Sequence, residues 1–165
     1  MNVALHFKTG NLVDALLNGE VDYITHCCNA QGVMGSGIAK EIRERIPEAY
    51  VEYMFSYNMS KRFSGISDFL GEVNCGGNVL NIVGQEYYGM DKKRYVNYGA
   101  LAAGFGKLAA CVEQLEDKYC DGIILGIPYK MASDRAGGDW NIVLELIQYL
   151  VVPYFKDVFI YKLPK

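Results

Sequence analysis

The feature that most constrains the fold is an apolar run that passes directly into a glycine-rich loop and then into a helix. Residues 21–28 are largely apolar and are typical of a buried strand. Asn29 follows, then a loop with glycines at positions 32, 35 and 37, and then a pattern of helical period. A strand, a short loop and a helix in this order form the building unit of α/β folds.

This first loop has the chemistry of an anion site. Glycine lets the backbone approach a ligand closely, and a helix N-terminus offers free N–H groups and the positive end of its dipole. We expect a phosphate there, with His26 and Asn29 facing it from the end of the strand. The alternative is a strand–turn–helix joint that binds nothing, because such joints are common.

A second loop of the same kind lies near the C-terminus. The apolar run 122–128 predicts a central strand, and residues 129–138 form a loop with glycines at 137 and 138. Asp139 suits the N-cap of the helix that follows. Because ligands sit beyond the carboxyl ends of strands in α/β sheets, the two loops should flank one crevice. A diphosphate would use both loops.

The remaining patterns complete the fold prediction. Strands alternate with helices, and one hairpin adds an antiparallel strand, which gives a three-layer α/β/α sandwich with a mixed central sheet. Pro47 should break or restart a helix that begins at Ser36. We expect a single domain over residues 1–165, with further strands at 2–8, 69–75, 79–83 and 158–163, and further helices at 13–17, 101–115 and 143–150.

Composition limits the function classes. The formal net charge is −3, which gives no strong indication of nucleic-acid binding, although a local basic patch stays open. Five cysteines without a CxxC pair, and only two histidines, do not indicate a zinc site, so we expect no metal and no cofactor. We expect reduced thiols, no signal peptide, no membrane span and a cytoplasmic protein.

Several catalytic motifs are absent from the sequence. It has no GxxxxGK[ST] loop, no complete GxGxxG pattern, no nucleophile elbow, and no arginine placed after a cysteine as in cysteine phosphatases. His26 is the candidate general acid or base, because a histidine titrates near neutral pH, unless it is a core histidine. Asn29 could hold a hydroxyl group or a water.

The second loop adds charged candidates. Asp134 and Asp139 bring carboxylates, although either could instead cap the next helix, and Arg135 suits a phosphate. Residues 84–98 are rich in tyrosine and lysine, and form either a solvated surface loop or a lid or rim over a ligand or partner.

These motifs together resemble those of the macro domain family, the ADP-ribose-binding α/β/α module, over nearly the whole chain. Residues 9–12 are similar to the family's turn after strand one, residues 26–39 to its first ribose and phosphate loop, and residues 127–128 and 136–140 to its second phosphate loop. Within the family, the chain is most similar to the branch of ADP-ribose 1″-phosphate phosphatases and the terminal ADP-ribose protein glycohydrolase.

The resemblance implies a role for each matching residue. Asn11, beside Leu12, takes the place of the aspartate that reads the adenine amino group, although it is neutral. His26 would take part in phosphatase catalysis and Asn29 would meet the distal ribose, with Asp134 or Asp139 assisting a water. The other ligand-binding positions would be Gly35, Ser36, Gly37 and Ile38 in the first loop, and Ser133, Arg135, Ala136 and Gly137 in the second.

Three functions follow from the resemblance. The first is removal of the terminal phosphate from ADP-ribose 1″-phosphate. The second is removal of ADP-ribose from protein or nucleic acid, without the covalent lysine of the glycohydrolase relatives, because residues 84–86 contain no lysine. The third is binding of ADP-ribose or a derivative without turnover. The sequence does not indicate an oligomeric state.

Overall fold

The computed structural model describes residues 5–165 and is built around a six-stranded mixed sheet. The strand order is β1–β6–β5–β2–β4–β3, and every neighbouring pair is parallel except the β3–β4 hairpin. The strands are β1 (Leu5–Thr9), β2 (Tyr23–Asn29), β3 (Val73–Gly76), β4 (Val79–Gln85), β5 (Ile124–Pro128) and β6 (Asp157–Lys162).

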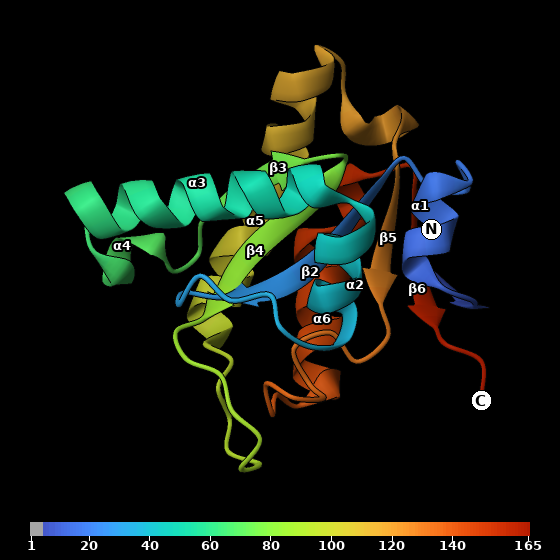
Figure 1. The fold of residues 1–165 in the computed structure, drawn as a ribbon. Coiled ribbons are helices and arrows are strands. Elements are labelled where there is room, and N and C mark those ends of the chain that lie inside the picture. The colour runs from blue at the N-terminus through green and yellow to red at the C-terminus, as the bar shows by residue number, and fades with distance from the viewer. Residues whose placement is uncertain (1–4) are drawn as a thin grey trace.

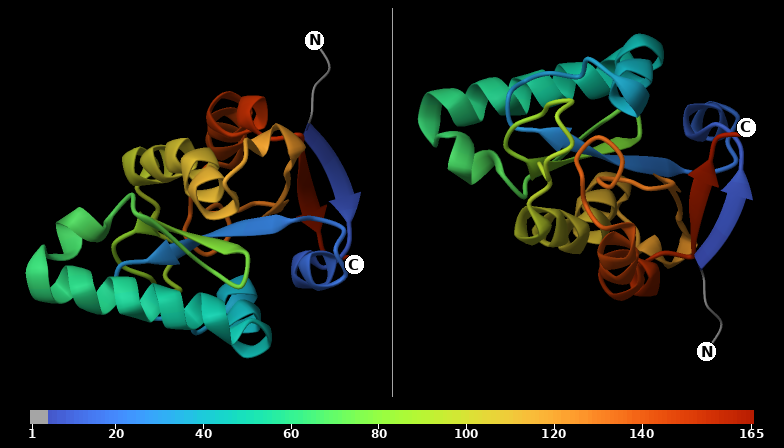
Figure 2. Two further views of the ribbon diagram at one scale, coloured as in Figure 1. Left: turned by 90° about the horizontal axis from the view of Figure 1, so that it is seen from above. Right: turned by 90° about the horizontal axis from the view of Figure 1, so that it is seen from below.

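Helices cover both faces of this sheet, which gives three layers (Figures 1 and 2). One face carries α1 (Leu12–Leu17), α2 (Gly37–Arg45), α3 (Pro47–Phe63) and the short α4 (Ile66–Phe69). The opposite face carries α5 (Tyr98–Glu116) and α6 (Trp140–Leu150). Two short 3₁₀ turns, Cys120–Gly122 and Val152–Tyr154, precede β5 and β6. The predicted sandwich with a mixed sheet is therefore confirmed.

The apolar periods explain why these elements form. On α5, Leu101, Phe105, Leu108 and Val112 recur at helical spacing and are all buried against the sheet. β4 is buried along its whole length, because it lies between two neighbouring strands and between two helical layers. Within residues 5–165, no helix is long and apolar enough to cross a membrane.

Helix α3 starts where the sequence predicted, because Pro47 occupies its first position and ends α2 at Arg45. Ser36 holds the N-cap position of α2, but its side chain makes no capping hydrogen bond.

The predicted hairpin begins later than expected. The hairpin starts at Val73 rather than at residue 69, because residues 66–69 form α4 and bury Phe69 among the α3 aromatic rings. Gly71, with φ +83°, then redirects the chain into β3. The first strand runs from Leu5 to Thr9, and residues 2–4 of its predicted range lie outside the described residues.

Close packing of α5 on the sheet depends on one glycine. A Cβ atom added to Gly104 would lie 2.3 Å from Cγ2 of Ile82 on β4, much closer than packed carbon atoms approach. Gly106, on the same helix, has nothing within 4 Å of its Cβ position. These two glycines therefore share a helix and differ in their surroundings.

We predict opposite effects of alanine at these two positions. Gly104→Ala should destabilise the protein by about 1–3 kcal/mol, because the core must shift to admit a methyl group. Gly106→Ala should stabilise it by about 0.5–1 kcal/mol, because alanine loses less backbone entropy in a helix. Chemical denaturation measures both changes. Equal effects at the two positions would contradict the packing described for Gly104.

Candidate functional site

One large cavity opens at the carboxyl ends of the parallel strands. Its volume is about 910 Å³, within the range typical of small-molecule sites. Its walls come from the ends of five strands and the segments that follow them: residues 10–12 after β1, residues 26–29 of β2 and the loop after it, residues 88–90 after β4, residues 129–132 and 134–136 after β5, and residues 161–163 at the end of β6. The crevice expected from the two glycine loops therefore exists.

Buried hydrogen bonds hold the first loop. The Tyr53 hydroxyl donates to the Asn29 carbonyl oxygen at 2.7 Å and accepts from the Val33 N–H at 3.2 Å. The Asn29 amide donates to the Val33 carbonyl oxygen at 2.8 Å and accepts from the Gln31 N–H at 2.9 Å. Gly32 is obligatory in this loop, because its φ is +75° and a Cβ atom would lie 2.7 Å from the Tyr57 ring.

These bonds change the interpretation of Asn29. We expected its amide to hold a ribose hydroxyl or a water. The structure shows that both ends of the amide already bind the backbone of the loop, and that the residue is largely buried. Asn29 thus shapes the loop and also lines the cavity, and its role as a catalytic group stays a prediction.

The loop leads into α2, and the N-terminus of this helix lies at the cavity. Gly35, Ser36, Gly37 and Ile38 all line it, as predicted. Gly37 has φ +57°, and the extended Ser36 that precedes it leaves the first-turn N–H groups without a side-chain cap. Such uncapped N–H groups, together with the helix dipole, favour an anion at this point.

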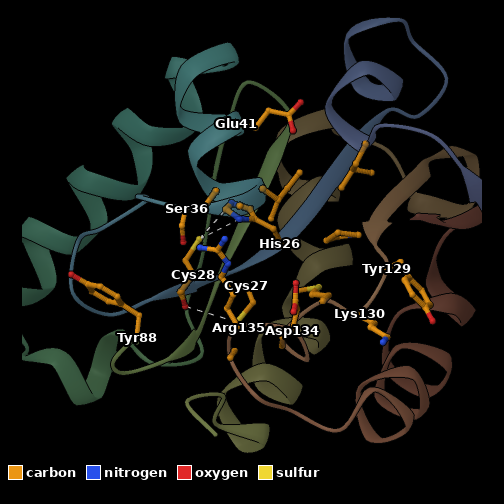
Figure 3. A pocket seen from close by; sticks show the side chains of 18 of the residues that line it. His26, Cys27, Cys28, Ser36, Glu41, Tyr88, Tyr129, Lys130, Asp134 and Arg135 are labelled. Carbon is orange, nitrogen blue, oxygen red and sulfur yellow. Dashed lines mark hydrogen bonds between the residues drawn. The ribbon is translucent and has the colours of Figure 1, made fainter. Parts of the chain in front are cut away.

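The second loop forms the facing wall. Lys130 and Ala132 adopt left-handed conformations, with φ of +58° and +59°, and the turn is closed by the Gly138 N–H donating to the Ala132 carbonyl oxygen at 2.9 Å. Asp134 and Arg135 are exposed and line the cavity. Figure 3 shows these two side chains across the cavity from Ser36 and Glu41.

Three predicted residues of this segment lie elsewhere. Ser133, Gly137 and Asp139 are not among the residues that line the cavity. The Ser133 hydroxyl donates to the Met131 carbonyl oxygen within the turn, and Gly137 packs against the Lys93 backbone. Asp139 caps α6, where its carboxylate accepts from the Asn141 N–H at 2.9 Å. Of the second-loop candidates, Asp134, Arg135 and Ala136 reach the cavity.

The position of His26 is the largest correction. His26 is among the residues that line the cavity, yet its side chain is fully buried on the side of the sheet that α3 covers, so the imidazole is not exposed to the cavity as we expected. Its Nε2 lies 2.6 Å from the Asn81 Oδ1 atom. The Asn81 amide nitrogen in turn donates to the Ala49 carbonyl oxygen of α3 at 3.0 Å.

Burial also sets the protonation state of His26. Loss of solvation lowers its pKa to about 4, and the hydrogen bond with Asn81 offsets only part of this change. A neutral Nε2–H tautomer fits this bond, because Asn81 Oδ1 is an acceptor. His26 is therefore neutral near pH 7, and its predicted role as a general acid or base stays a prediction that its burial does not favour.

The neighbouring thiols are equally unreactive. Burial raises the pKa of Cys27 to about 12 and also raises the pKa of Cys28 well above its ordinary value. The thiolate is the nucleophilic form of cysteine, so neither residue supplies a nucleophile at neutral pH. Within residues 5–165, no group of three or more His, Cys, Asp or Glu side chains is gathered as a metal site.

The far end of the cavity holds a polar group that sequence reasoning missed. Asn11 caps α1 by accepting from the Asp14 N–H at 2.8 Å, which directs its amide nitrogen toward Glu41 Oε1 at 2.9 Å. Arg45 donates to the same Glu41 oxygen at 2.9 Å and to Asp14 at 2.8 Å. Asn11, Leu12 and Glu41 line the cavity, so this end presents an amide donor beside a carboxylate.

The tyrosine-rich loop forms part of the rim. Tyr88, Gly89 and Met90 line the cavity. This favours the interpretation of the segment as a rim over its interpretation as a solvated surface loop. The base of this loop is tied to the second loop, because the Ala136 carbonyl oxygen accepts from both the Tyr95 N–H at 2.7 Å and the Val96 N–H at 3.0 Å.

Solved structures that share this arrangement include several macrodomains. The macrodomain of Mycobacterium tuberculosis DarG matches with TM-score 0.67 and 18% identity, covering 98% of each chain. A macrodomain protein from Streptomyces coelicolor matches with TM-score 0.67 and 22% identity, covering 95% of this chain and 97% of that one. DarTG of Thermosipho africanus, solved with ADP-ribose, matches with TM-score 0.65 and 19% identity, covering 97% of this chain and 41% of that one.

No protein-family model and no curated protein matches the sequence. The likeness to solved structures extends over nearly the whole chain, and it shows that the chain has the macrodomain fold.

We predict that His26 makes stability depend on pH. Its pKa falls from an ordinary 6.5 to about 4 on folding, so the unfolded chain takes up the proton first as the pH drops. Above pH 6.5 the imidazole is neutral in both states and costs no stability. As the pH falls from 6.5 through 4, the lower pKa in the folded state reduces the free energy of unfolding by about 3 kcal/mol in all. The free energy of unfolding, measured across this range, should fall less steeply in His26→Gln.

The second histidine supplies the control. His6 is exposed on β1 beside Asp157, and His6→Gln should keep the steep fall of the parent protein. Parallel curves for the parent and His26→Gln would show that His26 is not a buried neutral group.

Proposed function

We propose that this chain binds ADP-ribose or a derivative of it in the large cavity. The observation that carries the proposal is that the α2 N-terminus and the Arg135 side chain face one another across a cavity of nucleotide size. Free N–H groups and a guanidinium are the two groups best suited to a diphosphate. The structure of Thermosipho africanus DarTG in complex with ADP-ribose, 41% of which matches this fold, supports this ligand.

The polar end near Asn11 suits the base of this ligand. An adenine offers an acceptor at N1 and a donor at its amino group. The Asn11 amide nitrogen could donate to the first, and the Glu41 carboxylate could accept from the second. Position 11 is an asparagine here and supplies no carboxylate. In this arrangement Glu41, on α2, supplies the carboxylate instead.

We predict that Arg135→Gln weakens binding of ADP-ribose by about tenfold or more, because a charge-assisted hydrogen bond to a phosphate is lost. Isothermal titration calorimetry gives the Kd directly. Arg43→Gln is the matched control, because it removes the same charge from α2 outside the residues that line the cavity. Equal weakening in both variants, or no binding by the parent protein, would contradict the proposal.

A second candidate function is hydrolysis at the distal end of the bound ligand, and the position of Asp134 favours it. Asp134 is an exposed carboxylate on the cavity wall, next to Arg135. A carboxylate there could accept a proton from an attacking water, while the arginine stabilises the phosphate. ADP-ribose 1″-phosphate is the substrate that we propose first, and ADP-ribosylated protein or nucleic acid is the alternative.

We predict that Asp134→Asn lowers turnover by about a hundredfold or more while ADP-ribose still binds, because a general base contributes at least that factor. Phosphate release from ADP-ribose 1″-phosphate and ADP-ribose release from modified protein or nucleic acid measure the two reactions. Asp139→Asn is the control, because asparagine caps a helix as well as aspartate does.

The outcomes of this experiment separate the three functions. Phosphate as the product identifies a phosphatase, and ADP-ribose as the product identifies a de-ADP-ribosylating hydrolase. Tight binding without either product identifies a binding module. Equal turnover in the parent protein and Asp134→Asn would show that Asp134 is not the base.

A further inference from the structure

The outer face of α3 is lined by a stripe of exposed apolar side chains. Val51, Phe55, Met59 and Phe63 follow one another at intervals of four residues, and their exposed fractions are 61%, 61%, 43% and 67%. Side chains four residues apart form a continuous ridge on a helix. We call these four residues the α3 stripe.

This stripe points away from the rest of the molecule. The opposite face of α3 is buried against the sheet through residues such as Ala49 and Tyr53. Figures 1 and 2 show α3 lying along the outside of the molecule, with no other element on its outer side. None of the residues of α3 lines the large cavity. The stripe is therefore separate from the proposed ligand site.

A row of exposed apolar side chains is typical of an interaction surface. Single apolar residues on a surface are ordinary, but contiguous apolar surface marks an interaction site. Aromatic residues and methionine, which supply three of the four positions, are also enriched at protein interfaces. The stripe thus has both the arrangement and the composition of a contact surface.

Charged residues at the two ends of the stripe indicate what that partner is. Glu48 and Glu52 lie near its N-terminal end, and Arg62 lies at its C-terminal end. In the part of the chain from residue 5 onward, none of these three side chains forms an ion pair. The surface is acidic at one end, apolar in the middle and basic at the other end.

We propose that the partner is a second copy of this chain, packed through its own α3 stripe in the antiparallel direction about a twofold axis. In this arrangement, each residue of the α3 stripe faces the residue of the second copy that lies equally far from position 57 on the other side. Phe55 then lies against Met59 of the second copy, and Val51 lies against Phe63 of the second copy. The end that carries Glu52 meets the end that carries Arg62. Twofold contacts of this kind require such a self-complementary patch.

This arrangement also suits the helices themselves. Antiparallel packing places the positive N-terminal end of each α3 dipole beside the negative C-terminal end of the other. The ridge of one helix can pack into the groove beside the ridge of the other. Because α3 does not line the cavity, both cavities of the dimer stay open to ligand.

The first test is the dependence of molecular mass on concentration. In analytical ultracentrifugation, the full chain should pass from the mass of one copy to that of two as its concentration rises. Phe55→Glu should raise the dimer Kd by about tenfold or more, because a central aromatic anchor is replaced by a charge. Tyr149→Glu, at a site on α6 that is also exposed, should leave the dimer Kd unchanged.

A charge exchange tests the direction of packing. Arg62→Glu and Glu52→Arg should each be monomeric, because like charges then meet at both ends of the stripe. An equimolar mixture of the two variants should form a mixed dimer, because both ends then join opposite charges. Circular dichroism and binding of ADP-ribose provide checks that each variant is folded.

Three results would overturn the proposal. The parent chain could stay monomeric at all concentrations, which would leave the stripe to a different protein. Phe55→Glu could dimerise as well as Tyr149→Glu, which would place the contact elsewhere. The mixed charge variants could stay monomeric although the parent dimerises, which would exclude the antiparallel arrangement.

Discussion

The geometry of the cavity depends on hydrogen bonds that the polar side chains of β2 make inside the protein. Thr25 donates to the Leu80 carbonyl oxygen at 2.8 Å, His26 bonds to Asn81, and Asn29 bonds to the first loop. A buried polar group left without a partner costs about 1–3 kcal/mol, so each of these bonds strongly favours one conformation. The strand therefore fixes both its own register and the path of the loop that follows it.

The same bonds also place α3. Asn81 reaches the Ala49 carbonyl oxygen of this helix, and the Tyr53 hydroxyl of the helix reaches Asn29. α3 is thus held against the sheet by polar contacts as well as by apolar packing, and it supports the loop that leads to α2 at the cavity. Its inner face is fully used in this way, which leaves the α3 stripe as the part of the helix available to a partner.

Much of the fold could be predicted because its determinants are local. Pro47 and the isoleucines spaced by four residues mark the boundary between α2 and α3, and the two loops meet because they follow parallel strands. The orientation of His26 could not be predicted. A strand that is buried on both faces shows no apolar alternation, and the partner of the imidazole, Asn81, lies 55 residues away in the sequence. Glu41 was missed for a similar reason, since its contact with Asn11 depends on the packing of α1 beside α2.

The shared acceptor at Ala136 links two parts of the cavity wall mechanically. One carbonyl oxygen holds the N–H groups of both Tyr95 and Val96, and it belongs to the loop that carries Arg135. A displacement of that loop shifts the base of the tyrosine-rich segment with it. If a phosphate binds Arg135 as proposed, a shift of the second loop would therefore also move the segment that carries Tyr88 and Met90.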